Sequence, residues 1–165
     1  MEISKVSNTS IKLKGKNASV VIDPSGKVEA DVVIASAHKD SLSIDKVEGK
    51  RLVVSGPGEY EVGGISITGK DTKGGVLYQL LEGVKVLFAP SSALSYVPDD
   101  EDFDALIIKL SGEVAKDAFA PINAKCVVLL GDLSLTHMKA EEVENTSKIN
   151  LKKTAEISGK TFLIS

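Results

Sequence analysis

Three side chains of the types used in hydrolytic chemistry stand close together in the segment 31–41, DVVIASAHKDS. Ser36, His38 and Asp40 follow the apolar run 32–35, which is typical of a strand, so we expect them in the loop at its end. They are the residue types of a nucleophile, a general base and an orienting acid. Two-residue spacing within one loop does not readily place a base against a buried acid, and no Gly-x-Ser-x-Gly elbow occurs. We therefore do not predict a serine triad.

An imidazole and a carboxylate are also zinc ligands, but a zinc hydrolase needs at least three such protein ligands and an open position for water. The metal would lower the pKa of that water, so that hydroxide exists near neutral pH. The chain offers two histidines, His38 and His137, and one cysteine, Cys126. Asp40 and Asp132 would have to converge with them, yet Asp132 lies six positions beyond Cys126 along a predicted strand. We expect His38 to be a partly exposed loop residue hydrogen-bonded to a neighbour, and Cys126 to be buried.

The sharpest charge feature is the acidic run from Asp99 to Asp104. Such a run could meet a basic partner or a calcium ion through its oxygen atoms. It lacks the glycine and the spaced ligands of an EF-hand loop, so we interpret it as a solvated loop.

Composition sets the class of protein. A chain of 165 residues with 42% apolar and 26% charged residues is expected to form one domain, residues 1–165. Its net charge of −3, 4% aromatic content and lack of tryptophan argue against nucleic-acid or anionic-membrane partners. The first ten residues lack the apolar region of a signal peptide. No stretch approaches the about 20 apolar residues of a membrane-spanning helix. A lone cysteine fits a reducing compartment. We expect a cytoplasmic protein.

Short β-favouring runs dominate the elements that must position these side chains. Two hairpins are predicted, one over residues 11–23 with a turn at 15–17, the other over 75–88 with a turn at 82–83. About ten to twelve strands are expected in all; the others cover residues 32–35, 51–55, 59–62, 65–68, 105–110, 126–130 and 161–164. Helices are predicted only over 113–119 and 139–143, with Thr136 capping the second.

The order of these elements resembles a known family. Asp23-Pro24 ends the first hairpin, the His38 and Asp40 loop follows the next strand, and the block 56–64, GPGEYEVGG, comes after it. This arrangement resembles the small ascorbate-lactonase-like branch of the metallo-β-lactamase-like hydrolases, over roughly residues 1–135. The resemblance implies an αββα sandwich, in which two mostly antiparallel β-sheets pack face to face with few outer helices and a metal site at one sheet edge.

The ligand set that the resemblance implies is largely replaced. On the family's His-x-His-x-Asp-His motif the chain has Ser36, His38, Asp40 and Ser41, so only His38 and Asp40 remain as ligand types. The other three ligand positions correspond to Phe88, Ser91 and Gly131. Serine hydroxyls are poor zinc ligands, and a centre does not tolerate losing about five of seven. We expect no catalytic residue, no metal and no cofactor, with zinc on His38 and Asp40 as the alternative.

Two classes of function remain from the sequence. The favoured one is a non-catalytic protein of this fold, kept as a binding or assembly module with a protein or small-molecule partner. The alternative is a metal-dependent hydrolase with an atypical or subunit-shared site. A small-ligand binder that uses the old substrate cleft is a third reading. We also predict a homodimer, because a sandwich with few helices leaves strand edges that either charges such as Lys12 and Lys14 or a second copy must cover.

Overall fold

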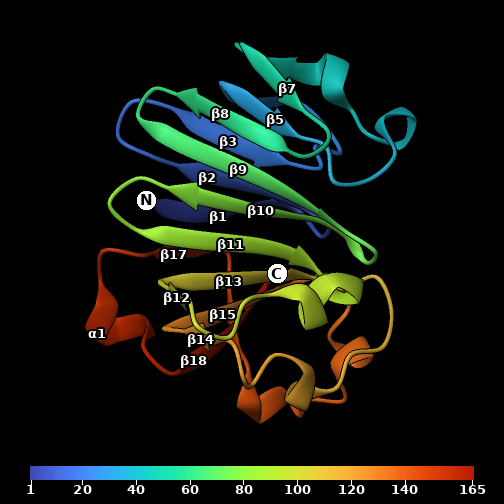
Figure 1. Cartoon of the computed structure of the whole chain (residues 1–165), viewed down its shortest axis with the longest axis vertical. Coiled ribbons are helices and arrows are strands. Elements are labelled where there is room, and N and C mark those ends of the chain that lie inside the picture. The colour runs from blue at the N-terminus through green and yellow to red at the C-terminus, as the bar shows by residue number, and fades with distance from the viewer.

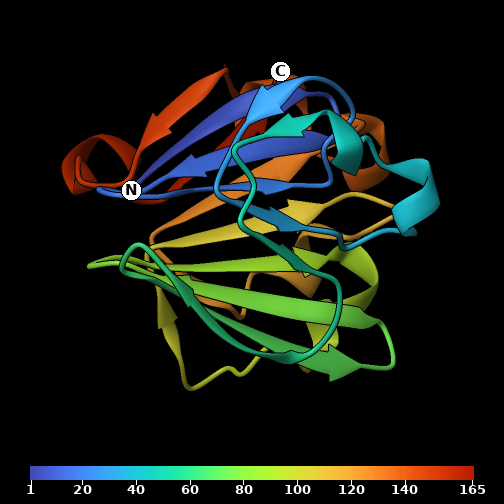
Figure 2. The ribbon, with the colours of Figure 1, turned by 90° about the horizontal axis from the view of Figure 1, so that it is seen from above.

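Two β-sheets packed face to face make up the computed structural model, which describes residues 1–165 (Figure 1). Seen from above, they form two separate layers (Figure 2). The six-stranded sheet has the order β17 (Lys148–Asn150), β1 (Glu2–Ser7), β2 (Ser10–Lys14), β3 (Ser19–Ile22), β5 (Val32–Ile34) and β7 (Leu52–Val54). The eight-stranded sheet has the order β16 (Glu144–Thr146), β18 (Lys160–Ile164), β15 (Cys126–Leu130), β13 (Ala105–Lys109), β11 (Lys85–Pro90), β10 (Gly75–Leu81), β9 (Ile65–Thr72) and β8 (Gly58–Val62).

Both sheets mix strand directions. Of the twelve neighbouring strand pairs in the two sheets, six are antiparallel and six are parallel, so parallel pairing is more frequent than the sequence indicated. The parallel strands β3 and β5 are buried at every residue, as their unbroken apolar runs predict. Two further strand pairs, β4 (Val28–Glu29) with β6 (Val47–Glu48) and β12 (Asp102–Phe103) with β14 (Asn123–Ala124), lie outside the main sheets.

The main hydrophobic core fills the space between the sheets and contains 26 buried residues. A second cluster of 14 residues packs loops onto the far side of the eight-stranded sheet. Strand β9 needs no such cover, because its buried and exposed residues alternate and Ser66, Thr68 and Lys70 face water. The predicted two-sheet sandwich is thus confirmed.

Helices are scarcer than predicted. The one α-helix is α1 (Thr154–Ile157); six 3₁₀ turns span Lys39–Ser41, Ile44–Lys46, Ser91–Tyr96, Lys116–Ala118, Leu133–Thr136 and Ala140–Glu142. The predicted helix 113–119 is wrong because the Val114 N–H donates to the Leu135 carbonyl (2.7 Å), which ties this segment to a neighbouring loop. The predicted helix 139–143 is one 3₁₀ turn that runs into β16, since so short a segment does not nucleate a helix. Thr136 ends the preceding 3₁₀ turn instead of capping a helix.

The glycine block shapes the turn between the two sheets. Gly58 (φ +146°) and Gly64 (φ +86°) adopt backbone angles that other residues rarely reach, which explains their residue type. Tyr60 packs on the main core, and its hydroxyl donates to the Pro57 carbonyl (3.4 Å). No helix here has both the length and the apolar character needed to cross a bilayer.

Candidate functional site

A buried carboxylate, Asp23, organises the end of the sandwich to which the sequence assigns the metal motif. Asp23 follows β3 with a left-handed backbone (φ +49°) and is 1% exposed. Its carboxylate accepts hydrogen bonds from the backbone N–H groups of Ser36 (2.7 Å) and Ala37 (3.2 Å) and from the Ser36 hydroxyl. One side chain therefore fixes the start of the loop that carries His38, and it holds Ser36, the residue in the first ligand position, by its hydroxyl.

The counter-ion of this carboxylate is Lys109, which comes from the other sheet. Its ammonium group forms an ion pair with Asp23, and the lysine side chain is 18% exposed. Because Asp23 follows a strand of the six-stranded sheet and Lys109 ends β13 of the eight-stranded sheet, the pair joins the two layers. Lys109 is not among the site residues expected from the sequence. The signal that could have identified it is a lysine inside the otherwise apolar run 105–110.

Tyr78 adds a second buried polar group to the sandwich interior. Its ring is fully buried on β10, and its hydroxyl has no hydrogen-bond partner. Burial, with smaller contributions from Tyr60 and Asp23, raises the pKa of Tyr78 to about 12. The hydroxyl therefore stays protonated and neutral.

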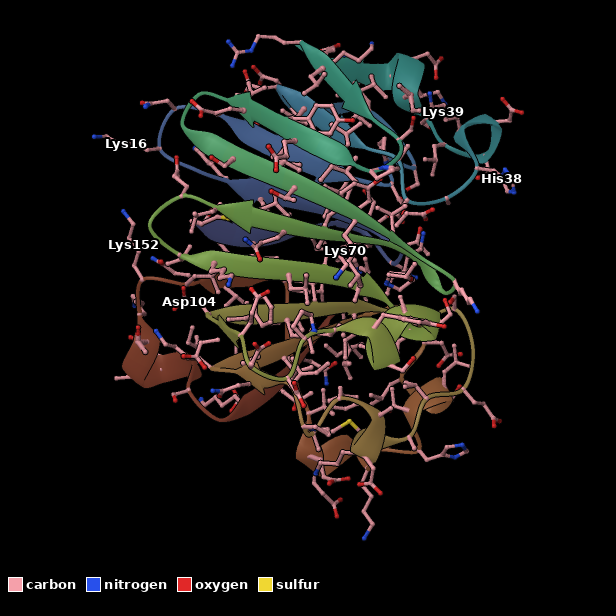
Figure 3. All side chains as sticks on the ribbon, in the orientation of Figure 1. Lys16, His38, Lys39, Lys70, Asp104 and Lys152 are labelled. Atoms are coloured by element: carbon pink, nitrogen blue, oxygen red, sulfur yellow. The ribbon has the colours of Figure 1, made fainter.

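His38 and Asp40 are both exposed in the loop after β5, at the 3₁₀ turn Lys39–Ser41. Figure 3 shows His38 at the outer edge of the molecule. Their side chains have no hydrogen-bond or ion-pair partner; the contact in this loop is between the His38 carbonyl and Ser41, whose N–H (3.0 Å) and hydroxyl (2.7 Å) both donate to it. His38 is thus an exposed loop residue hydrogen-bonded to a neighbour, as expected, but the bond uses its backbone carbonyl and its ring faces solvent. His38 and Asp40 form no group with a third ligand-type residue.

The residues that the resemblance assigns to the remaining ligand positions have other contacts in the structure. Phe88 is fully buried in the main core, and Ser91 bonds to Ser111 through its hydroxyl (3.2 Å). Gly131 has a φ of +126°, and a Cβ there would lie 3.2 Å from Leu110. This donor set does not fit a zinc ion, since it offers a phenyl ring, hydroxyls that bond to protein groups and an ammonium cation.

The other ligand-type residues lie apart from this loop. Cys126 is 1% exposed at the start of β15, as predicted, and burial raises its thiol pKa to about 12, which leaves it protonated. Asp132 follows the end of the same strand and accepts from the Ser134 N–H (2.9 Å), a bond that lowers the pKa of Asp132. His137 is exposed and lies 3.6 Å from Glu113.

Three of the five carboxylates of the acidic run are paired within the chain. Glu101 forms an ion pair with Lys85 (2.5 Å), and Asp104 forms one with Lys125 (2.6 Å). Asp102 accepts from the Asn123 amide. These contacts favour its interpretation as a structural loop, which secures the small β12–β14 pair beside the eight-stranded sheet.

Comparison with known proteins places this geometry in a family. A family model described as the beta-lactamase superfamily domain matches residues 2–88, more than half of the chain. A crystal structure from Thermotoga maritima, assigned to the metallo-beta-lactamase superfamily, aligns over 99% of this chain and 98% of its own, with a TM-score of 0.72 and 20% identity. Zn²⁺-bound PqqB from Methylobacterium extorquens aligns over 80% of this chain and 78% of its own, with a TM-score of 0.51 and 13% identity.

No curated protein sequence matches the chain significantly. At such low identities the two solved structures show the fold, whereas the family model covers β3 and β5 and the loops after them, which carry Asp23, Ser36 and His38. The narrower placement in the ascorbate-lactonase-like branch stays a prediction. The chain belongs to the beta-lactamase superfamily, and its fold is that of the metallo-β-lactamase-like proteins.

Proposed function

We propose that this protein is a non-catalytic member of the metallo-β-lactamase fold that acts as a binding or assembly module. The observation that carries the proposal is the Lys109–Asp23 ion pair at the end of the sandwich where the resemblance places a metal. An ammonium cation repels a second cation, and the Asp23 carboxylate already accepts from four donors. The chemistry of the site thus supports internal neutralisation in place of metal binding.

One observation favours the alternative, a metal-dependent hydrolase whose site is atypical or shared between subunits. His38 and Asp40 are both exposed, so ligands of a second subunit could approach them. Such a centre would place zinc outside the Asp23 cluster, where Lys109 does not compete.

Metal content separates the two proposals. We expect protein purified without chelator to contain well below one equivalent of zinc, iron or manganese, and a chelator to leave its melting temperature unchanged, because no metal-binding energy stabilises the fold. Elemental analysis and thermal unfolding measure both. A matched His38→Ala variant identifies the source of any metal: stoichiometric zinc that disappears in this variant would establish the hydrolase alternative.

Assembly is the second part of the proposal. Lys12 and Lys14 do not guard an edge, because β2 lies between β1 and β3 inside its sheet. The edge strand β7 instead exposes Val53, one of three large apolar side chains left at the surface, together with Leu81 and Tyr96. We propose a homodimer that covers this edge and buries about 1,200–2,000 Å² in total.

Sedimentation over a wide concentration range tests the dimer. The parent protein is expected to sediment as a dimer at high micromolar concentration, and Val53→Lys to shift it to monomer, because edge charges oppose strand pairing. Leu81→Lys is the matched control on another strand. A parent that remains monomeric at high micromolar concentration would refute the dimer.

A further inference from the structure

Lysines gather at the end of the sandwich opposite the His38 loop. Lys12 and Lys14 lie on the outer side of β2, and Lys16 follows in the turn to β3. Figure 3 shows Lys16 and Lys152 projecting from the same end of the molecule, whereas His38 and Lys39 lie at the other end. The chain as a whole carries a net charge of −3, so this local excess of cations stands out from its background.

A cavity of about 330 Å³ opens among the first three lysines. Its lining contains two alanines and two glycines; the other residues are polar or charged and include Asn17 and Ser19 beside the lysines. A neighbouring cavity of about 340 Å³ shares Lys14 and Lys16 with it. It adds Lys148 and Lys152, and also the carboxylates of Glu2 and Glu82, of which Glu2 pairs with Lys148 (2.9 Å). Two hollows thus meet along the strand end and turn that carry Lys14 and Lys16.

Cations exceed carboxylates in the first cavity, which we call the basic cavity. Its three ammonium groups face two carboxylates, those of Glu29 and Asp31. Asp31 is already engaged by the Ser19 N–H (2.8 Å) and by the Arg51 guanidinium (3.5 Å). Lys14 and Lys16 have no carboxylate within ion-pair distance, so their charges are available to a ligand.

The walls of the basic cavity are held by contacts across the fold. The Lys12 ammonium donates to the backbone carbonyl of Glu29, which sets its position. Glu82, from the β10–β11 turn of the other sheet, accepts from the Lys16 N–H (2.8 Å). Glu82 lies so close to Gly15 that a Cβ there would be 2.6 Å from its carboxylate. The turn is therefore positioned before any ligand arrives.

We propose that the basic cavity binds a small anion that bears phosphate groups, which would be the ligand of the binding function proposed above. Lysine ammonium groups bind phosphate as point charges through charge-assisted hydrogen bonds. Lys12 and Lys14 project from one face of a strand about 7 Å apart along the backbone, so two anionic groups of one ligand can be held together. The Glu29 carboxylate opposes the ligand and limits its affinity.

Calorimetric titration with inorganic pyrophosphate at low ionic strength tests the proposal. The parent protein is expected to bind one equivalent saturably. Lys14→Gln is expected to weaken binding about tenfold, because one charge-assisted contact is lost. Glu29→Gln is expected to tighten binding several-fold, because it removes the opposing charge. Lys14 and Glu29 are exposed, so neither change threatens the fold. Lys70→Gln, an exposed lysine on β9 away from this end, is the matched control and should leave binding unchanged.

Weaker pyrophosphate binding by Lys14→Gln together with tighter binding by Glu29→Gln would support the site. Absence of saturable binding, or equal weakening by Lys14→Gln and Lys70→Gln, would overturn it in favour of non-specific charge attraction. Metal content is measured separately. Stoichiometric zinc would overturn the proposed non-catalytic function but not the proposed anion site. Metal-free protein that does not bind pyrophosphate would refute the anion site alone.

Discussion

Replacing Lys109 with alanine is expected to destabilise the fold by about 3–5 kcal/mol, the cost of leaving a buried charge without its partner. Asp23 is 1% exposed, and Lys109 is its sole ion-pair partner. Without the ammonium, the Asp23 carboxylate remains in the interior with no counter-ion and is held only by its bonds from Ser36 and Ala37.

Urea unfolding of Lys109→Ala beside Lys125→Ala measures this effect. Lys125 forms an ion pair with Asp104 but has a half-exposed side chain (49%), so its loss should cost much less than the loss of Lys109, because solvent screens an exposed ion pair. The double variant Asp23→Asn with Lys109→Met should recover part of the stability, since no unpaired charge remains and asparagine tolerates the left-handed backbone at position 23. If Lys109→Ala and the parent were equally stable, the Asp23–Lys109 ion pair would not be needed to stabilise the fold.

The strands could be predicted from the sequence because each is a short local pattern. Strands β10 and β15 have the predicted bounds, and the hairpin around Gly15 and the continuous burial of β3 follow from local residue types. Strand β1 was missed because its sequence, EISKVS, mixes polar and apolar residues. It is held by pairing both to the neighbouring β2 and to β17, which is far away along the chain. The helices were mispredicted because sheet and loop contacts override weak local helix preference.

The sequence predicts the loop of the candidate site but not the ion pair beside it, because only the loop is encoded locally. The loop and its exposed His38 and Asp40 follow a recognisable strand, so local sequence locates them. The Asp23–Lys109 pair joins residues 86 positions apart across two sheets, and no local pattern encodes such a contact. A lysine within an apolar run is a usable signal, because a buried ammonium group needs a partner. Such a signal indicates that a partner exists but not which carboxylate it is.

Gly74→Ala is expected to destabilise the protein by about 3 kcal/mol, in the upper part of the range for an overpacked site. Gly74 lies in the turn between β9 and β10, and a Cβ there would be 2.0 Å from the Ser92 carbonyl oxygen and 2.8 Å from the Ala93 Cα. Both neighbours are backbone atoms, which cannot rotate away as a side chain can. Ala93 is fully buried, and the Ser92 hydroxyl donates to the Gly74 carbonyl (2.6 Å), so packing and hydrogen bonding both hold the two segments together.

Gly112→Ala is the matched control for Gly74→Ala. Neither glycine has a positive φ, and a Cβ at Gly112 would meet nothing within 4 Å. Alanine there should be neutral or stabilise by up to about 1 kcal/mol, because it restricts the unfolded chain. Urea unfolding of the two variants should therefore shift the midpoint down for Gly74→Ala and leave it level or raise it for Gly112→Ala. If the midpoint shifted little in both variants, the turn at Gly74 would be able to move away from Ser92. The close approach at Gly74 would then not be needed to hold the Ser91–Tyr96 segment over the sheet.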